Sequence, residues 1–158
     1  MDFAKPAPVQ LKPTPIHELL DHTLEFLNND LLKHKIKVIR NYQLEHDLKL
    51  NIDANQLKQA LLNIFLNAIE AMPSAGELLV SSHLSAMPDY AMITIHDTGI
   101  GIAKEDVPHI FDPFFTKKDH GTGLGLSITH EIIKNHNGRI FVESQIGKGT
   151  MFAIELPL

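Results

Sequence analysis

A long amphipathic helix in the middle of the chain constrains the fold more than any other feature of the sequence. Residues 53–72 carry apolar side chains three or four residues apart, at Leu57, Leu61, Ile64, Ala68 and Met72. These side chains form one continuous stripe along a helix. Asp53 followed by Gln56 is typical of a capping box at a helix start. A helix with one apolar stripe must bury it against another layer, so the sequence predicts a layered domain built around this helix.

The remaining segments supply the other elements of the domain. Two further helices are predicted at residues 14–35 and 123–137, and strands at residues 36–43, 77–85, 90–97, 139–145 and 150–157, with a short extended piece at 48–52. Most strands follow one another as hairpins. The pattern predicts an α+β fold, a two-layer α/β sandwich in which a mixed sheet of about five strands is covered on one face by three helices. Residues 98–122 lack periodicity and are expected to be irregular.

The composition indicates one soluble domain and excludes several classes of protein. The chain has 158 residues, of which 44% are hydrophobic and 21% charged, which is enough for one sizeable core. A net charge of −5 is unfavourable for a nucleic-acid binder, which needs clustered Lys and Arg. The sequence has no cysteine for a disulfide or thiolate metal site, and no apolar run of membrane-spanning length. Residues 1–13 are proline-rich and polar, as in a linker.

A second stripe on the long helix is polar and allows two interpretations. It consists of Gln59, Asn63, Asn67 and Glu70. Asparagine is a weak helix former, so Asn63 and Asn67, one turn apart in a helix interior, need an explanation. A solvated polar face is the ordinary one. The alternative is that both amide oxygens point into a site, where neutral oxygen ligands suit Mg²⁺ if phosphates supply the negative charge.

Two glycine clusters lie in the second half of the chain. Residues 97–104 (DTGIGIAK) follow a strand, and residues 121–128 (GTGLGLSI) lead into the last helix. Neither cluster has the third glycine of G-x-G-x-x-G, and the phosphate loop G-x-x-x-x-G-K-[ST] is absent. Glycines before a helix N-terminus are typical of an anion site, because N–H groups and the helix dipole converge there. Turns and close packing explain either cluster equally well when it is taken alone.

Four motifs taken together resemble one known family. The segments NIFLNAIEAMP, HDTGIGI, IFDPFFTKK and GTGLGLSI resemble the N, G1, F and G2 boxes of the catalytic ATP-binding domain of sensor histidine kinases, in the family's order. The resemblance covers the chain from about residue 53 onward and implies the Bergerat fold, with ATP and Mg²⁺ as ligands. It also implies that residues 1–13 are a linker left from an upstream dimerisation domain and that residues 14–158 form the ATP-binding domain.

The resemblance implies a role for each residue that matches a motif. Asp97 would accept a hydrogen bond from the exocyclic amine of adenine, and Thr150 would support it through a hydroxyl or water. Asn67 would bind Mg²⁺, with Asn63 as a second metal ligand or phosphate contact. The base would lie against Ala71, Gly99, Gly101 and Ile102, and the phosphates against Lys117, Lys118, Gly121, Thr122, Gly123, Leu124, Gly125 and Leu126. The catalytic residues expected on this basis are Asn63, Asn67 and Lys117.

The alternatives within the wider superfamily are a stand-alone GHKL ATPase and a serine kinase of the anti-sigma-factor type. In those relatives a glutamate one turn before the Mg²⁺ asparagine is the general base. This chain has Asn63 there, and an amide cannot accept a proton in that role. The F box also favours the histidine kinases, and its phenylalanines are expected to be packing anchors: Phe111, Phe114 and Phe115. Glu70 replaces a lysine that reaches the phosphates in many relatives, and the lid is short, with only DH between TKK and GTGLG.

The nucleophile of a histidine kinase comes from a separate domain. His17 followed by Glu18 superficially resembles that site, but the proline expected five residues on is missing, so His17 is predicted to be a surface residue. The expected partners are ATP or ADP, the dimerisation and histidine-phosphotransfer domain of the parent kinase, and a downstream response regulator, without nucleic acid or membrane contact. The expected location is cytoplasmic, which includes the cytosolic part of a membrane-bound kinase.

Overall fold

The computed structural model describes residues 8–117 and 123–158. The helices are α1 (Ile16–Phe26), α2 (Asn28–Lys33), α3 (Ala54–Ala71) and α4 (Gly125–Asn135), with a 3₁₀ turn, η1 (Val107–His109). The strands are β1 (Lys12–Pro15), β2 (Ile36–Tyr42), β3 (Lys49–Ile52), β4 (Gly76–Leu84), β5 (Tyr90–Asp97), β6 (Arg139–Gln145) and β7 (Gly149–Pro157).

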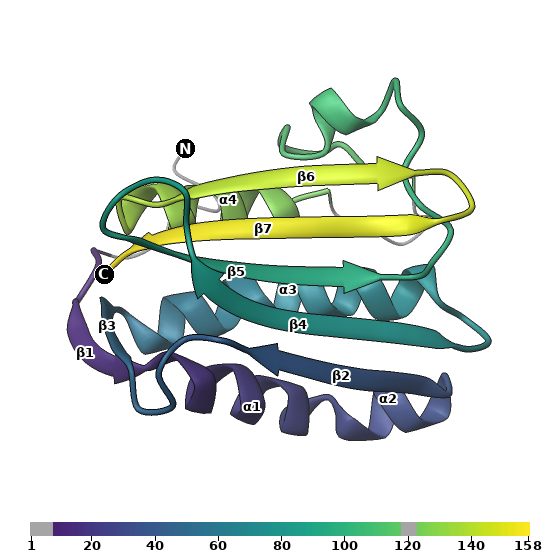
Figure 1. Cartoon of the computed structure of the whole chain (residues 1–158). Coiled ribbons are helices and arrows are strands. Elements are labelled where there is room, and N and C mark those ends of the chain that lie inside the picture. The colour runs from purple at the N-terminus through teal and green to yellow at the C-terminus, as the bar shows by residue number, and fades with distance from the viewer. Residues whose placement is uncertain (1–7, 118–122) are drawn as a thin grey trace.

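Five of the strands form one mixed sheet in the order β2-β4-β5-β7-β6. β2 and β4 are parallel, and every other pair in this sheet is antiparallel. Figure 1 shows α1, α3 and α4 packed on the same face of the sheet. The predicted two-layer α+β sandwich is therefore confirmed. β1 and β3 pair separately as a small two-stranded sheet.

The core lies between α3 and the large sheet. The predicted stripe of α3 is buried, with Leu57, Leu61, Ile64, Ala68 and Met72 each no more than 3% exposed. It belongs to one apolar cluster with alternate strand residues such as Ile93 and Ile154, which are paired across β5 and β7. Side chains alternate between the two faces of a strand. The alternation that buries Ile93 and Ile95 therefore puts Asp97, the last residue of β5, on the helix-covered face.

The first predicted helix is in fact two helices. α1 ends at Phe26, and Leu27 has non-helical backbone angles, with φ −96° and ψ 9°. Asn28 and Asn29, which follow, are the first residues of α2, and asparagine is favoured at helix ends over helix interiors. Leu27 is only 3% exposed, so the break coincides with a side chain that packs into the core.

The starts of α1 and α4 also differ from the prediction. Pro15 and Thr14 belong to β1, which begins at Lys12, two residues before the domain start predicted at residue 14. β1 pairs antiparallel with β3, and Lys12 lies opposite Ile52. α4 begins at Gly125 rather than Gly123 because Gly123 has a φ of +73°, which a helix does not allow.

His17 is buried, so its prediction as a surface residue is wrong. Its side chain is 5% exposed, and its Nε2 lies 2.7 Å from Ser82 Oγ on β4. The ring stacks on Tyr42, with centroids 4.4 Å apart. The Tyr42 hydroxyl donates in turn to Asp21 Oδ1. Burial, and next the hydrogen bond to Asp21, raise the pKa of Tyr42 well above its usual range. His17 is thus part of the packing between α1 and the sheet.

Candidate functional site

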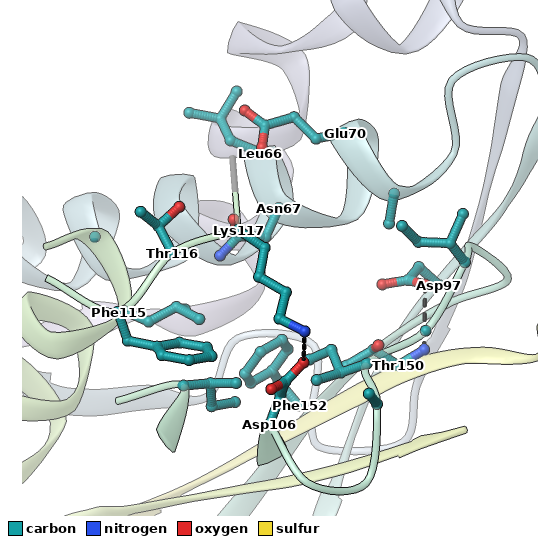
Figure 2. A pocket seen from close by; sticks show the side chains of 18 of the residues that line it. Leu66, Asn67, Glu70, Asp97, Asp106, Phe115, Thr116, Lys117, Thr150 and Phe152 are labelled. Carbon is teal, nitrogen blue, oxygen red and sulfur yellow. Dashed lines mark hydrogen bonds and ion pairs between the residues drawn. The ribbon is translucent and has the colours of Figure 1, made fainter. Parts of the chain in front are cut away.

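A cavity of about 950 Å³ lies between α3, the start of α4, the loop after β5 and the first residues of β7 (Figure 2). Most of the predicted site residues line it: Asn63, Asn67, Ala71, Asp97, Gly101, Ile102, Lys117, Gly123, Gly125, Leu126 and Thr150. Gly99 and Leu124 lie next to lining residues in the chain but do not line the cavity themselves. Lys118, Gly121 and Thr122 fall outside the described residues. The structure therefore brings together residues from all four sequence motifs.

Asp97 lies at one end of this cavity and is held by backbone groups. It is 4% exposed. Its Oδ1 accepts hydrogen bonds from the N–H groups of Gly99, at 2.9 Å, and Thr150, at 3.2 Å. Burial raises the pKa of the Asp97 carboxyl, although these two hydrogen bonds and the nearby His96 partly oppose the shift. Because both donors reach the same oxygen, Oδ2 is the oxygen that remains for a ligand.

The backbone N–H of Thr150 donates to Asp97 directly, and the Thr150 hydroxyl contacts another side chain. Thr150 Oγ1 lies 2.7 Å from Ser144 Oγ on the neighbouring strand β6. Ser144 Oγ also accepts from the N–H of Ile102 and donates to the carbonyl of Gly149. Ser144 therefore ties together the loop after β5 and the β6–β7 turn, while the Thr150 N–H contacts Asp97 directly.

The two glycines after Asp97 allow close approach to protein backbone. A Cβ at Gly99 would lie 2.5 Å from the carbonyl oxygen of Ala71 at the end of α3. Gly101 has a φ of +78°, and a Cβ there would collide with the carbonyl of Gln145. The predicted close approach to the base is thus accompanied by a structural requirement, because these contacts clamp the loop between α3 and the β6–β7 turn.

Asn63 and Asn67 both reach the cavity, but Asn63 also connects two helices. Its Nδ2 donates to the carbonyl of Gly125, at 2.9 Å, and to Thr129 Oγ1, at 3.2 Å. Gly125 is the first residue of α4, and the side chain of its N-cap residue, Leu124, makes no capping hydrogen bond. Asn63 therefore fixes the position of the α4 N-terminus relative to α3, and Asn67 lies one turn further along α3.

Lys117 extends into the cavity and pairs with an acidic residue that the sequence motifs do not include (Figure 2). Its Nζ lies 2.6 Å from Asp106 Oδ2. The hydrogen bond and the charge of Asp106 raise the pKa of Lys117 above its ordinary value, so the side chain stays an ammonium. The Lys117 side chain is 68% exposed, whereas that of Asp106 is only 14% exposed.

Apolar side chains form another part of the cavity wall. Ile110, Phe115 and Phe152 line it, and Phe111 packs edge-on against Phe152, with ring centroids 6.3 Å apart. Phe111 and Phe115 are partly buried against the core, as predicted for packing anchors. Phe114 is 60% exposed, so the same prediction is wrong for its side chain. Its backbone has the anchoring role, because the Phe114 N–H donates to the carbonyl of Gly123 at 2.8 Å.

Sequence reasoning missed several residues at or beside this site, including Asp106, Ser144 and Phe152. A signal existed for two of them, because alternation along the predicted strands puts Ser144 on the face of Val142 and Phe152 on the face of Ile154. Asp106 lies in the irregular segment, where no periodicity indicates which side chains turn inward. Its position depends on the folded loop alone.

Two classes of feature are not found in the described part of the chain. Within residues 8–117 and 123–158, no group of three or more His, Cys, Asp or Glu side chains is arranged to hold a metal ion. Over the same ranges, every helix is too short or too polar to cross a membrane.

The sequence and the fold both match known proteins. Residues 52–158 match the family described as "Histidine kinase-, DNA gyrase B-, and HSP90-like ATPase". Sporulation kinase C of Bacillus subtilis (strain 168) is 37% identical over 156 residues, which cover 99% of this chain and 36% of the relative. Sensor histidine kinase ZraS of Escherichia coli (strain K12) is 35% identical over 158 residues, which cover 100% of this chain and 33% of the relative.

Solved structures give the same result. The nucleotide-free catalytic domain of histidine kinase ThkA has a TM-score of 0.83 and 32% identity, over 94% of this chain and 95% of that one. ThkA in complex with response regulator protein TrrA gives a TM-score of 0.79 and 29% identity, over 94% of this chain and 42% of that one. The chain therefore belongs to the histidine kinase-, DNA gyrase B- and HSP90-like ATPase family, as a histidine kinase catalytic domain. It spans about a third of the length of the curated relatives named above.

Proposed function

We propose that this domain binds Mg·ATP in the cavity and donates the γ-phosphate to a histidine on a separate dimerisation domain. The observation that carries the proposal is the arrangement of the cavity. A buried carboxylate, Asp97, lies at one end, and Asn67 and the N-terminus of α4 supply neutral and positive polar groups elsewhere in the wall. This arrangement suits a ligand with a neutral base and a polyanionic tail.

The adenine would bind at Asp97. Oδ2 of Asp97 would accept a hydrogen bond from the exocyclic amine, a group that guanine replaces with a carbonyl oxygen. Ala71, Gly101 and Ile102 would lie against the base, since all three line the cavity. Gly99 would contribute through its N–H, which orients Asp97 rather than touching the base.

The phosphates would bind towards the N-terminus of α4. A helix N-terminus offers backbone N–H groups and the positive end of the helix dipole to an anion. Gly123, Gly125 and Leu126 line the cavity here, and Lys117 adds a mobile positive charge. We extend the site to Lys118, Gly121, Thr122 and Leu124 on the resemblance alone.

Mg²⁺ fits this donor set, provided that the nucleotide brings the negative charge. Asn67 would contribute an amide oxygen, and Asn63, whose Nδ2 is engaged with α4, would contribute its oxygen as second ligand or contact a phosphate. Amide oxygens and waters suit Mg²⁺, which binds proteins through few ligands when phosphates are present. When bound, the ion would neutralise charge on the phosphates.

Catalysis by this domain would consist of positioning and electrostatic stabilisation of the transferred phosphoryl group. Asn63 cannot serve as a general base, which is unfavourable for activation of water. His17 is buried against Ser82 and Tyr42, which is unfavourable for a role as acceptor, and we assign the acceptor histidine to another domain.

The proposed partners follow from this role. Residues 1–13 would connect the domain to the dimerisation and histidine-phosphotransfer domain of the parent kinase, although residues 12 and 13 also contribute to β1. A response regulator would receive the phosphate next, and the complex of ThkA with TrrA supports a partner of that class. Because ATP is the proposed substrate, we place the domain in the cytoplasm. We propose no contact with nucleic acid, since the net charge of −5 is unfavourable for it.

Nucleotide selectivity tests the proposal directly. Calorimetric titration should give tighter binding of ATP and ADP than of GTP and GDP. Asp97→Asn keeps the shape of the side chain but presents either an uncharged acceptor or a donor to the base. The substitution should weaken the binding of ADP by about 1.5–3 kcal/mol, since a charge-assisted hydrogen bond is lost. Equal binding of ADP and GDP by the unmodified domain would refute the assignment of Asp97.

The proposed metal ligand makes a separate prediction. Asn67→Ala should weaken ADP strongly in the presence of Mg²⁺ and only slightly in chelator, because the amide contacts the ion and not the base. The matched control is Gln59→Ala, which removes an amide from the polar stripe of α3 at a position that does not line the cavity. Equal losses for Asn67→Ala with and without Mg²⁺ would mean that its role is structural.

A further inference from the structure

The ion pair between Lys117 and Asp106 joins a fixed group to a movable one. Asp106 precedes η1, and its backbone is held by two turns, in which its N–H donates to the carbonyl of Ala103 and its carbonyl accepts from His109. Its carboxylate is largely enclosed, at 14% exposure. Lys117 is 68% exposed on a chain segment outside regular secondary structure. Asp106 is therefore the anchor, and Lys117 is the group that can move.

The pair lies inside the proposed nucleotide site. It occupies Lys117, the one cationic side chain among the described residues of that site. Lys117 is the only Lys or Arg among the described residues that line the cavity, which also contains Glu70, Asp97 and Asp106. Among these carboxylates, the Lys117 ammonium contacts Asp106, at 2.6 Å. This contact holds the Lys117 ammonium at Asp106, so a phosphate in the cavity would compete with the carboxylate for its charge.

We propose that Asp106 is a latch on Lys117, which a nucleotide must open by offering its terminal phosphates in place of the carboxylate. The inference rests on the proposed function, since it requires that polyphosphate binds in this cavity. A polyphosphate carries more negative charge than one carboxylate and approaches as a free ligand, so it can take over the ammonium. Asp106 is then left without its cation in an anionic neighbourhood, which makes the exchange costly.

The latch gives the site a dependence on the phosphate tail. Adenosine cannot compete for Lys117, because it has no anionic group, so it should bind without opening the pair. ATP must open the pair and therefore binds less tightly than its contacts would allow. Removal of the Asp106 charge should strengthen the binding of ATP and leave the binding of adenosine unchanged. Asp106 acts through Lys117 and is a positioning residue, not a catalytic one.

The test is calorimetric titration of ATP, ADP and adenosine into the whole chain and four variants. Asp106→Asn keeps the shape of the side chain and should tighten the binding of ATP about two- to fivefold. The gain is small because an ion pair with an exposed lysine contributes little free energy in water. Lys117→Met should weaken ATP. In the double variant, Asp106→Asn should have no further effect on ATP, since the cation that it restrains is gone. Glu105→Gln removes the same charge from a neighbouring exposed residue and should have the smaller effect.

The outcomes separate the latch from its alternatives. Unchanged or weaker ATP binding by Asp106→Asn, with normal ADP binding by the unmodified chain, would overturn the latch and leave the proposed function intact. An equal gain in the Glu105→Gln variant, or in the double variant over Lys117→Met, would reduce the effect to general electrostatics and also overturn it. Failure of the unmodified chain to bind any adenine nucleotide would instead overturn the proposed function.

Discussion

At the scale of single residues, Asp97 carries a cost for the fold together with its proposed role. It is 4% exposed, and its two backbone donors compensate only one of its oxygens. Burial of a carboxylate disfavours its charged form, which is the cause of the raised pKa. Such a group is expected where a ligand, and not the protein, provides the missing hydrogen bond. An ionised Asp97 therefore weakens the folded domain, and the proposed nucleotide would offset this cost.

The sign of this effect makes a prediction about stability. Because the pKa of Asp97 is higher in the folded than in the unfolded chain, the stabilising contribution of Asp97 is fully present below its ordinary value of 3.8 and is lost as pH rises through the raised value. Above the raised pKa, the ionised carboxylate weakens the fold. Asp97→Asn should therefore melt at the same or a higher temperature while it loses affinity for ADP. A clear fall in Tm at pH 7 would show that the carboxylate stabilises the fold.

The same pKa predicts how nucleotide binding depends on pH. As pH falls through the raised pKa of Asp97, protonation removes the charge from the acceptor. The difference in ADP affinity between the unmodified domain and Asp97→Asn should therefore disappear. ADP titrations of both proteins at a series of pH values provide the measurement, and the variant corrects for protonation of the nucleotide. A difference in affinity that stays constant down to pH 4, about the ordinary carboxyl pKa, would contradict the role of this carboxylate.

How far single residues could be predicted depends on whether sequence or tertiary contact decides their environment. The resemblance to the family's motifs placed Asp97 and Asn67 at one site, and both line the cavity because they lie on regular elements. The position of the Thr150 hydroxyl was not predicted, because it depends on Ser144 of a neighbouring strand. Burial of His17 was also missed, since it results from the approach of Ser82 on β4, far away in the sequence.

At the scale of elements, the start of α3 shows how a local signal is completed by the fold. The Asp53 side chain accepts from the N–H of Gln56, as predicted for the first half of a capping box. The Asp53 N–H, however, donates to Nε2 of His136, which is buried at the end of α4. The cap therefore links α3 to α4 and helps to set the spacing of the two helices that enclose the site.

Removal of this cap should weaken the whole domain. Although burial acts in the opposite direction, backbone N–H groups of Gln10, Gln56 and Asn55 lower the pKa of Asp53. Asp53→Ala should cost about 1 kcal/mol in the free energy of unfolding, as for other N-caps, and Asp53→Asn should cost less because an acceptor remains. The measurement is denaturant unfolding at pH 7.

The pH dependence of that loss has a defined sign. A lowered pKa gives stability that is present above the unfolded value and is lost as pH falls through the folded value. The difference between the unmodified domain and Asp53→Ala should therefore shrink in acid, below the ordinary carboxyl value of 3.8. A difference that grows as pH falls would contradict the role of the charged cap.

Most elements could be predicted because their periodicity is strong over many residues. α3 and β5 match their predicted ranges closely, since one apolar stripe and one clean alternation define them. The break at Leu27 was missed because apolar spacing continues across it while the backbone turns. The paths of residues 98–117 were not predictable, since their order comes from contacts with α3, β6 and β7.

At the scale of the whole molecule, the proposed function gives this domain only the nucleotide half of a reaction. It spans about a third of the length of its curated relatives. Its histidine closest to a phosphoacceptor motif, His17, is buried in the packing of α1. Asn63 holds the start of α4, and its amide cannot act as a general base towards water. These features predict a domain that retains ATP intact until an acceptor is docked near the γ-phosphate.

The most direct test of this account is phosphate transfer in trans. The chain is incubated with Mg²⁺ and ATP labelled on the γ-phosphate, alone and with a histidine-kinase dimerisation domain that carries the phosphoacceptor histidine. The account predicts no label on the chain, slow ATP hydrolysis, and acid-labile label on the added domain. The rate should be low because the covalent link that raises the effective concentration is absent. Acid-labile label on the isolated chain that disappears in His17→Ala, or rapid ATP hydrolysis by the chain alone, would contradict it.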